Sequence, residues 1–336
     1  MNILIIKVGA IGDVIRTTSL LPGLKEKYPG ADISWLTKRS AADLLMSNHH
    51  LEKVYVLESD QQAVLKEKYD LLINMDDDLL LCQLATKISA DKRVGAYEEN
   101  GKCLYTDDAA QWFDMGLISR FGKEKADQLK LFNRKSYQQI AYEMLGLIYR
   151  HQEPIIVLQK QQISFAEEFK TKHNISPQEK IIGVNTGANS RWMDKKMSEE
   201  KTTELINLLH KQQKHSRIIL LGGAEERERN KSILAKVTAP VIDAGCDNSL
   251  MEFAALIAVC DVLVTSDSMA LHLATAFKKR IVVFFCPTSP WEIELYGRGE
   301  KIIPKKGCVC CYKSICSIRP EYDMREIVQK TLAQIQ

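Results

Sequence analysis

The sequence predicts an α/β protein made of two doubly wound domains. Three observations indicate this fold: short apolar runs alternate with amphipathic stretches, the alternation occurs twice, and a charged segment separates the two series. A chain of 336 residues suits two domains of ordinary size. We expect each domain to hold a parallel sheet, and the two domains to face a central cleft with ligands at the carboxyl ends of the strands.

The first series fills the first half of the chain. Strands are expected at residues 3–6, 32–36, 53–56 and 70–74, and helices at 17–27, 41–47 and 61–68. From about residue 117 to 150 the pattern becomes helical and polar, without a strand signal. The segment 151–179 is charged, rich in glutamine and interrupted by Pro154 and Pro177, which indicates a domain junction. We therefore assign residues 1–155 to the first domain and 156–336 to the second.

The second series follows the junction and has the same alternation. Strands are expected at residues 180–185, 216–221, 241–244, 261–265 and 280–285, and helices at 198–211, 225–236, 249–259 and 268–277. Each of these strands is followed by turn residues and then by a helical pattern, which is typical of βαβ units.

Composition excludes two classes of protein. The net charge of +3 is the difference between 46 basic and 43 acidic residues, and no long basic run occurs, so a nucleic-acid partner is not expected. No apolar run approaches the ~20 residues that span a bilayer. The N-terminus has no signal-peptide pattern, since its single lysine lies within a strand pattern. We expect a cytoplasmic protein.

The first glycine turn, Gly9-Ala-Ile-Gly-Asp13, follows the first strand and opens a helix. It is not the dinucleotide fingerprint, because it has two glycines and no acidic ribose ligand at the usual distance. A phosphate bound here would meet the carboxylate of Asp13. Two interpretations stay open: Asp13 caps the helix, or it acts as a general base on a hydroxyl held within ~3 Å.

The second domain has three polar strand ends in succession. Asn185–Trp192 contains hydroxyls, a glycine and Arg191, and Gly222–Glu225 contains two glycines before a carboxylate. Val264–His272 runs from a strand through hydroxyl groups and Asp267 into a helix, whose first amides can bind an anion. The alternative for this last motif is a helix cap with a packed histidine. Together the three strand ends predict a diphosphate site.

Cysteine and acidic clusters give two further candidates. Cys82, Cys103, Cys246, Cys260 and Cys286 are scattered and are expected to be buried apolar residues. Cys308, Cys311 and Cys316 allow a structural zinc or iron site closed by one more ligand, for which Asp323 is a candidate; the alternative is a set of reduced thiols in a surface hairpin.

The run Asp76–Asp78 could bind Mg²⁺ or be a solvated strand end, and we favour the solvated strand end.

The order of these motifs resembles glycosyltransferase family 9, the ADP-heptose:lipopolysaccharide heptosyltransferases, which have the GT-B fold of two Rossmann-like domains. The resemblance covers nearly the whole chain. It rests on Lys7 with Gly12-Asp13, Thr186-Gly-Ala188 with Arg191-Trp192, Gly222–Glu225, Ser266–His272, and the tail in which cysteines precede Met324–Ile327.

The resemblance implies an inverting transferase that needs no metal or other cofactor for catalysis. It would transfer a heptose from an ADP-sugar donor to a saccharide or glycolipid acceptor in lipopolysaccharide or a related surface glycan. The protein would then work at the inner face of the cytoplasmic membrane, with peripheral membrane contact. Two alternatives stay open: a transferase with another nucleotide-sugar or acceptor, and a non-catalytic nucleotide-sugar-binding module.

The resemblance also implies roles for single residues. Asp13 matches the catalytic base of the family, in an acceptor-binding first domain. A lysine commonly precedes the Arg-Trp pair, and since Ser190 stands there, Lys195 is expected to replace it. The donor-binding residues of the second domain are Thr186, Gly187, Arg191, Lys195, Gly223, Glu225, Asp267, Ser268, Met269 and His272, and the acceptor side has Gly9, Gly12 and Arg16.

Overall fold

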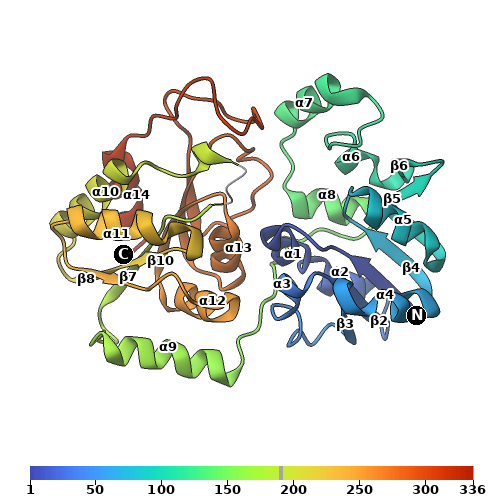
Figure 1. Cartoon of the computed structure of the whole chain (residues 1–336), viewed down its shortest axis with the longest axis horizontal. Coiled ribbons are helices and arrows are strands. Elements are labelled where there is room, and N and C mark those ends of the chain that lie inside the picture. Colours follow the sequence, from blue (N-terminus) through green and yellow to red (C-terminus); the bar gives the residue numbers. More distant parts are fainter. Residues whose placement is uncertain (189–191, 336) are drawn as a thin grey trace. The chain divides into compact units, whose positions relative to one another are not determined.

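The computed structural model describes residues 1–188 and 192–335 and divides the chain into two compact units (Figure 1). The first unit is Met1–Val157 with the short segment Trp291–Glu294, and the second is Leu158–Pro290 with Leu295–Gln336. Each unit contains one six-stranded sheet with helices packed against it. The predicted fold class, two doubly wound α/β units, is confirmed.

The sheet of the first unit has the strand order β3-β2-β1-β4-β5-β6. The bounds are β1 Asn2–Ile6, β2 Asp32–Thr37, β3 Lys53–Val56, β4 Lys68–Asn74, β5 Ser89–Glu99 and β6 Lys102–Tyr105. All neighbours are parallel except β5 and β6, which form an antiparallel hairpin. Side chains of β1 alternate between two apolar clusters, Ile3 and Ile5 in one and Leu4 and Ile6 in the other. Both faces of the sheet are therefore buried, as in other parallel sheets.

The sheet of the second unit is parallel throughout, with the order β12-β11-β10-β7-β8-β9. The bounds are β7 Lys180–Asn185, β8 Ser216–Leu221, β9 Val241–Asp243, β10 Val262–Ser266, β11 Arg280–Phe284 and β12 Gly299–Ile302. In both sheets the first strand of the unit lies in the middle, and the strand order reverses beside it. This reversal falls between β1 and β4 and between β7 and β10, the positions where doubly wound sheets bind ligands.

Helices connect the strands in both units. The first unit has α1 Ile11–Thr17, α2 Leu20–Lys27, α3 Arg39–Ala42, α4 Leu57–Lys66, α5 Leu79–Lys87, η1 Asp107–Ala109, α6 Ala110–Phe113, α7 Gly122–Phe132 and α8 Tyr137–Met144. The second has α9 Lys160–Lys172, η2 Met193–Lys195, α10 Glu199–Gln212, η3 Ala224–Glu226, α11 Arg227–Lys236, α12 Leu250–Val259, α13 Met269–Ala276 and α14 Met324–Ala333. Within the described ranges, none of these helices is long and apolar enough to cross a membrane.

Several elements differ from the prediction. The helix expected at 17–27 begins only at Leu20, after a break from α1, where the hydroxyls of Thr18 and Ser19 donate to the carbonyls of Ile15 and Arg16. The β5–β6 hairpin and α5 were not predicted, and α9 forms within the segment expected to be a junction. The turn that joins β5 and β6 contains Asn100 and Gly101, both at positive φ. This is a common hairpin signal that the sequence analysis missed.

The segment Trp291–Glu294 belongs to the first unit although it lies far along the chain. The backbone N–H of Tyr137 donates to the carbonyl oxygen of Glu292 over 3.0 Å. The guanidinium of Arg134 lies over the ring of Trp291, 4.7 Å from its centroid. Our sequence assignment placed all of 156–336 in the second domain, because no composition change marks these four residues.

Candidate active site

The strand ends at the centre of the second sheet are joined by side-chain hydrogen bonds. Asn185, the last residue of β7, donates from Nδ2 to Thr265 Oγ1 over 2.9 Å and to Ser268 Oγ over 3.3 Å. The two hydroxyls, Thr265 Oγ1 and Ser268 Oγ, lie 3.1 Å apart. Ser268 precedes α13, but its side chain makes no capping hydrogen bond, so the helix-cap interpretation is wrong for its hydroxyl. Ser268 instead links the end of β10 to the end of β7.

Asp267 is the centre of a buried polar cluster. Its Oδ2 atom lies 2.8 Å from Lys195 Nζ and accepts a 2.6 Å hydrogen bond from Thr288 Oγ1. Lys195 Nζ also donates to the backbone oxygen of Asp267 over 3.0 Å. His272 Nε2 lies 3.9 Å from Asp267 Oδ1. Three of the predicted donor-binding residues, Lys195, Asp267 and His272, are therefore together, and Thr288 joins them.

The charge state of Asp267 follows from these neighbours. Burial alone would raise the pKa of the carboxyl, since it penalises the charged form. The charges of Lys195 and His272, with hydrogen bonds from Lys195 and Thr288, outweigh burial and hold the pKa of Asp267 well below its ordinary value. Asp267 is therefore ionised over the whole working range of pH.

The loop after β8 buries Glu226 and exposes Glu225. Glu226 Oε1 pairs with Lys196 Nζ at 2.6 Å, and Glu226 Oε2 accepts from the N–H of Gly223 over 3.1 Å. A Cβ at Gly187 would lie 3.0 Å from Glu226 Oε2, so only glycine fits there without a shift. Glu225, the predicted nucleoside ligand, is exposed on η3 and accessible to a ligand.

Thr186 uses its hydroxyl inside the protein. Thr186 Oγ1 lies 2.6 Å from Asn230 Oδ1 and 3.1 Å from the carbonyl of Leu221. The backbone N–H of Thr186 also donates to Leu221. Thr186 thus fixes the turn after β7, and the segment that carries Arg191 begins there. Arg191, a predicted phosphate ligand, lies outside the described residues.

The strand ends at the centre of the first sheet hold a buried ion pair. Lys7 Nζ lies 2.6 Å from Asp76 Oδ1, and the N–H of Val8 donates to Asp76 Oδ2 over 2.7 Å. The interpretation of 76–78 as a solvated strand end is wrong for Asp76, whose side chain is only 10% exposed. It holds for Asp78, which is exposed and caps α5 by accepting from Leu80 N–H.

Asp13 lies in the first turn of α1, next to this ion pair. The N-cap position is Ala10 and Asp13 is the third helical residue, so the interpretation of Asp13 as the cap is wrong. Its carboxylate pairs with Arg16 Nη2 at 2.9 Å and remains 33% exposed. Burial lowers the pKa of Lys7, but the charges of Asp76 and Asp13 outweigh it and raise that pKa above its ordinary value.

Aromatic rings hold Arg16 in place. Its guanidinium lies over Tyr137, 3.9 Å from the ring centroid, and 5.6 Å from the centroid of Trp112. Of the two glycines predicted on the acceptor side, Gly12 is buried in α1. A Cβ built on Gly9 would meet nothing within 4 Å, so the turn is open at this residue.

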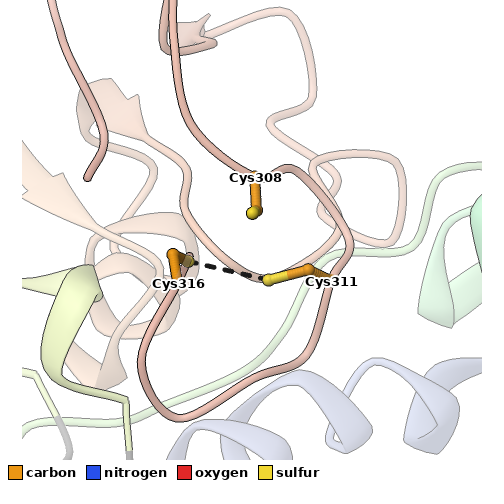
Figure 2. Close-up of side chains that lie close together, drawn as sticks. All are labelled: Cys308, Cys311 and Cys316. Atoms are coloured by element: carbon orange, nitrogen blue, oxygen red, sulfur yellow. Dashed lines mark hydrogen bonds between the residues drawn. The ribbon is translucent and has the colours of Figure 1, made fainter. Parts of the chain in front are cut away.

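Three predicted cysteine ligands lie together in the loop after β12 (Figure 2). The Sγ atoms of Cys308, Cys311 and Cys316 are all within 4.8 Å of one another. In the described part of the chain, no other three histidine, cysteine or acidic side chains approach closely enough to share a metal ion. Asp323 is not their fourth ligand, because it caps α14 and pairs with Lys305 at 2.7 Å. Cys286 is not an isolated apolar residue, since its Sγ lies 3.4 Å from Cys316 Sγ.

Comparison with known proteins identifies the family. Residues 59–320 match the sequence model of glycosyltransferase family 9 (heptosyltransferase). The chain belongs to this family. It is therefore a glycosyltransferase, as the sequence predicted, and it belongs to the heptosyltransferase group.

Three relatives illustrate the similarity of this family 9 glycosyltransferase to known members. It is 21% identical to the lipopolysaccharide core heptosyltransferase OpsX of Haemophilus influenzae, over 90% of this chain and 84% of that protein. A family 9 glycosyl transferase from Veillonella parvula has a TM-score of 0.78 at 17% identity, covering 99% and 97% of the two chains. The E. coli heptosyltransferase WaaC with ADP has a TM-score of 0.65 at 18% identity, covering 100% and 99%. The predicted GT-B fold is confirmed.

Sequence reasoning missed several residues of the two clusters in this glycosyltransferase. Lys7 and Asn185 were noted only as parts of motifs, Cys286 was expected to be a buried apolar residue, and Glu226 and Thr288 were given no role. One signal could have found them, because each lies at or just after the carboxyl end of a strand or in the loop that follows it.

Proposed function

We propose that this glycosyltransferase transfers a heptose from ADP-heptose to a saccharide acceptor of lipopolysaccharide or a related surface glycan, with inversion at the anomeric carbon. The observation that carries the proposal is the cluster of Lys195, Asp267, His272 and Thr288 at the centre of the second sheet. Nucleotides bind at this point of doubly wound sheets. Two of its relatives are named as heptosyltransferases, one of them with ADP.

In this proposal the second domain, residues 156–336, binds the donor. Arg191 and Lys195 neutralise the diphosphate, and the amides at Ser268 and Met269 at the start of α13 donate to its oxygens. Asp267 and His272 hold the sugar hydroxyls or the phosphates. Glu225 accepts hydrogen bonds from the nucleoside, while Gly187 and Gly223 allow close approach of the backbone. Thr186 positions the turn through Asn230.

The first domain, residues 1–155, would bind the acceptor and carry the base. Asp13 takes the proton of the acceptor hydroxyl as its oxygen attacks the anomeric carbon. The bond from that carbon to the diphosphate oxygen breaks, and ADP leaves with the electron pair. Arg16 orients the carboxylate of Asp13, and Gly9 leaves room for the acceptor. No metal or cofactor is needed for this step, since cationic side chains and amides balance the charge of the leaving group.

We also propose that the acceptor is reached at the inner face of the cytoplasmic membrane. The first unit exposes large apolar side chains in and beside α7, where Lys123 and Lys125 are exposed as well. The apolar residues are Leu117, Phe121, Leu131 and Phe132. Apolar and basic side chains together favour an anionic lipid surface. Flotation with anionic but not with neutral vesicles tests this contact.

The proposal includes a structural zinc or iron ion held by Cys308, Cys311 and Cys316. The support is the mutual distance of their sulfur atoms, within 4.8 Å, and the soft thiolate chemistry that both metals prefer.

A donor panel tests the proposed reaction. The protein is incubated with ADP-heptose, other ADP-sugars and UDP-sugars, and nucleotide release is measured with and without acceptor extracts. ADP release from ADP-heptose that depends on acceptor is expected. Release from another sugar nucleotide would change the donor, and binding of ADP-heptose without turnover would show a binding module instead.

A further inference from the structure

A fourth cysteine, Cys286, contacts one of the three cysteines of the loop (Figure 2 shows the three from the loop). Cys286 follows β11 by two residues and is buried. Its Sγ atom lies 3.4 Å from Cys316 Sγ, which in turn lies 3.6 Å from Cys311 Sγ. Sulfur atoms on a tetrahedral zinc ion, with bonds of about 2.3 Å, are about 3.8 Å apart. The distances from Cys316 Sγ to its two neighbours are therefore close to those of a thiolate site, whereas Cys286 Sγ does not lie within 4.8 Å of both Cys308 Sγ and Cys311 Sγ and has to move toward them when a metal binds.

Cys286 is held in the cluster by its thiol proton. Its Sγ donates to the carbonyl oxygen of Cys308 over 3.0 Å. A metal-bound thiolate has no proton to donate, so metal binding releases this contact and frees the sulfur to join the other three. Each thiol that binds the ion loses its proton to solvent, which balances the charge of the step.

Two large apolar side chains of the loop that carries the other thiols are exposed. An antiparallel bridge between Lys306 and Glu321 closes the loop at its base. Ile315 and Ile318 within it are 68% and 56% exposed, so they contribute little apolar burial. Small segments without a core of their own are commonly ordered by a metal ion or by disulfides.

This loop also contacts the segments that carry Lys195 and Thr288, two of the residues around Asp267. The carboxylate of Asp194 accepts a 2.5 Å hydrogen bond from the N–H of Cys316, and the N–H of Met193 donates to Ser314 over 3.2 Å. Lys195 follows directly in η2. On the other side, Thr288 lies two residues after Cys286, and the N–H of Tyr312 donates to Pro287 over 3.3 Å. Among the described residues, the two hydrogen-bond donors to Asp267 Oδ2 are thus attached to the cysteine loop.

We infer that Cys286, Cys308, Cys311 and Cys316 bind one zinc or iron ion as four thiolates, and that this site positions Lys195 and Thr288 on Asp267 for nucleotide binding. The second half of the inference rests on the proposed function, in which this unit binds the donor. The first half does not, because it concerns only the cysteines. Cys286 is then a metal ligand, and Asp194 is a positioning residue that joins the metal loop to the donor site.

Metal content and cobalt spectra test the ligand set without any donor. Protein purified under reducing conditions should contain one equivalent of zinc or iron, and the Co²⁺ form should show the absorption of four thiolates. Cys286→Ser should lose metal or show the weaker spectrum of three thiolates. Two control variants, Cys310→Ser in the same loop and Cys260→Ser in the core, should keep the parent spectrum. Metal-free parent, a parent spectrum in Cys286→Ser, or a Cys286–Cys316 disulfide that lowers the mass by two hydrogens would overturn the assignment.

Calorimetry with ADP tests the positioning role. Removing the metal with a chelator, or by Cys286→Ser, should weaken ADP binding about ten-fold, the effect of misplacing one charge-assisted hydrogen bond. Thr288→Val should weaken ADP binding similarly while retaining the metal. An unchanged Kd in the metal-free protein would overturn the positioning role. If the metal-loaded parent does not bind ADP at all, the proposed donor site fails, whereas the metal result stands by itself.

Discussion

Lys7 and Asp76 form a buried ion pair, 2.6 Å from Nζ to Oδ1, between residues 69 positions apart in the chain. The pair lies where the strand order of the first sheet reverses, between β1 and β4. It links the turn that leads into α1 to the end of β4, and Asp13 is the third residue of that helix. The pair therefore fixes the start of the helix that carries the proposed base.

Removing one partner of this pair should destabilise the protein. Asp76→Leu leaves a buried ammonium group and an unpaired Val8 N–H, and we expect the free energy of unfolding to fall by about 3–5 kcal/mol. The double variant Lys7→Met with Asp76→Leu removes both charges and should recover much of that loss. Urea unfolding measures both values. If the double variant were no more stable than Asp76→Leu, desolvation of the lysine would not be the cause.

Asp13→Asn should separate catalysis from folding. Asp13 is not the helix cap, so the substitution should leave the melting temperature within a few degrees of the parent. Loss of a general base typically lowers the rate about 10²–10⁴-fold. The Kd for ADP should change little, since the donor residues belong to the second domain in our proposal. Asp43→Asn is the control, since Asp43 is exposed and belongs neither to the cluster around Asp267 nor to the one around Asp76; it should retain full activity. Turnover of Asp13→Asn within a few-fold of the parent would exclude its role as base.

Asp267 should contribute stability that is lost in acid. Its pKa is lowered in the folded protein, so the folded state binds fewer protons than the unfolded state as the pH approaches the ordinary carboxyl range of about 4. Its contribution is present above that pH and falls as the pH drops toward the lower folded pKa. We expect the stability difference between parent and Asp267→Asn to shrink from pH 6 to pH 3 in urea titrations. A difference that stayed constant or grew on acidification would contradict this ionisation.

Substitutions at the neighbouring residues Glu225 and Glu226 should affect different properties, the affinity for ADP at Glu225 and the stability of the fold at Glu226. Glu226→Gln removes a buried charge that pairs with Lys196, and we expect a loss of about 1–3 kcal/mol in the free energy of unfolding. Glu225→Gln changes an exposed residue and should alter only the Kd for ADP. Thermal melts and calorimetry on the matched pair measure both effects. Equal stability of the two variants would mean that the Glu226 contacts contribute nothing to folding.

The sequence was informative where polar residues of a site come directly after a strand in the chain. Periodicity predicted most strands, and the Val264–His272 motif predicted Asp267 and His272. The family resemblance added Lys195, and the three lie together in the structure. It could not predict contacts between elements that are distant in sequence. Asp76 looked solvated because the run of three aspartates is polar, and only the pairing of β4 with β1 brings it to Lys7.

Two residues show the same limit. Cys286 looked like a core thiol, since its distance along the chain from Cys316 gives no sign that their sulfur atoms meet. Glu225 and Glu226 both follow the glycine pair, and the sequence does not show which of them is buried. In the structure Glu226 is the buried one, because it contacts Lys196 and the N–H of Gly223.

The return of Trp291–Glu294 to the first unit has a consequence for how the chain is made. Residues 1–157 are synthesised well before Trp291–Glu294, which follow about 130 residues later. At about 5–20 residues per second, the interval is on the order of ten seconds. During that time Arg134 lacks its stacking ring and Tyr137 N–H lacks its acceptor. The first unit therefore reaches its final form only after most of the second has emerged, so a nascent chain stalled before residue 291 should be more sensitive to protease at α8 than one stalled well beyond residue 294.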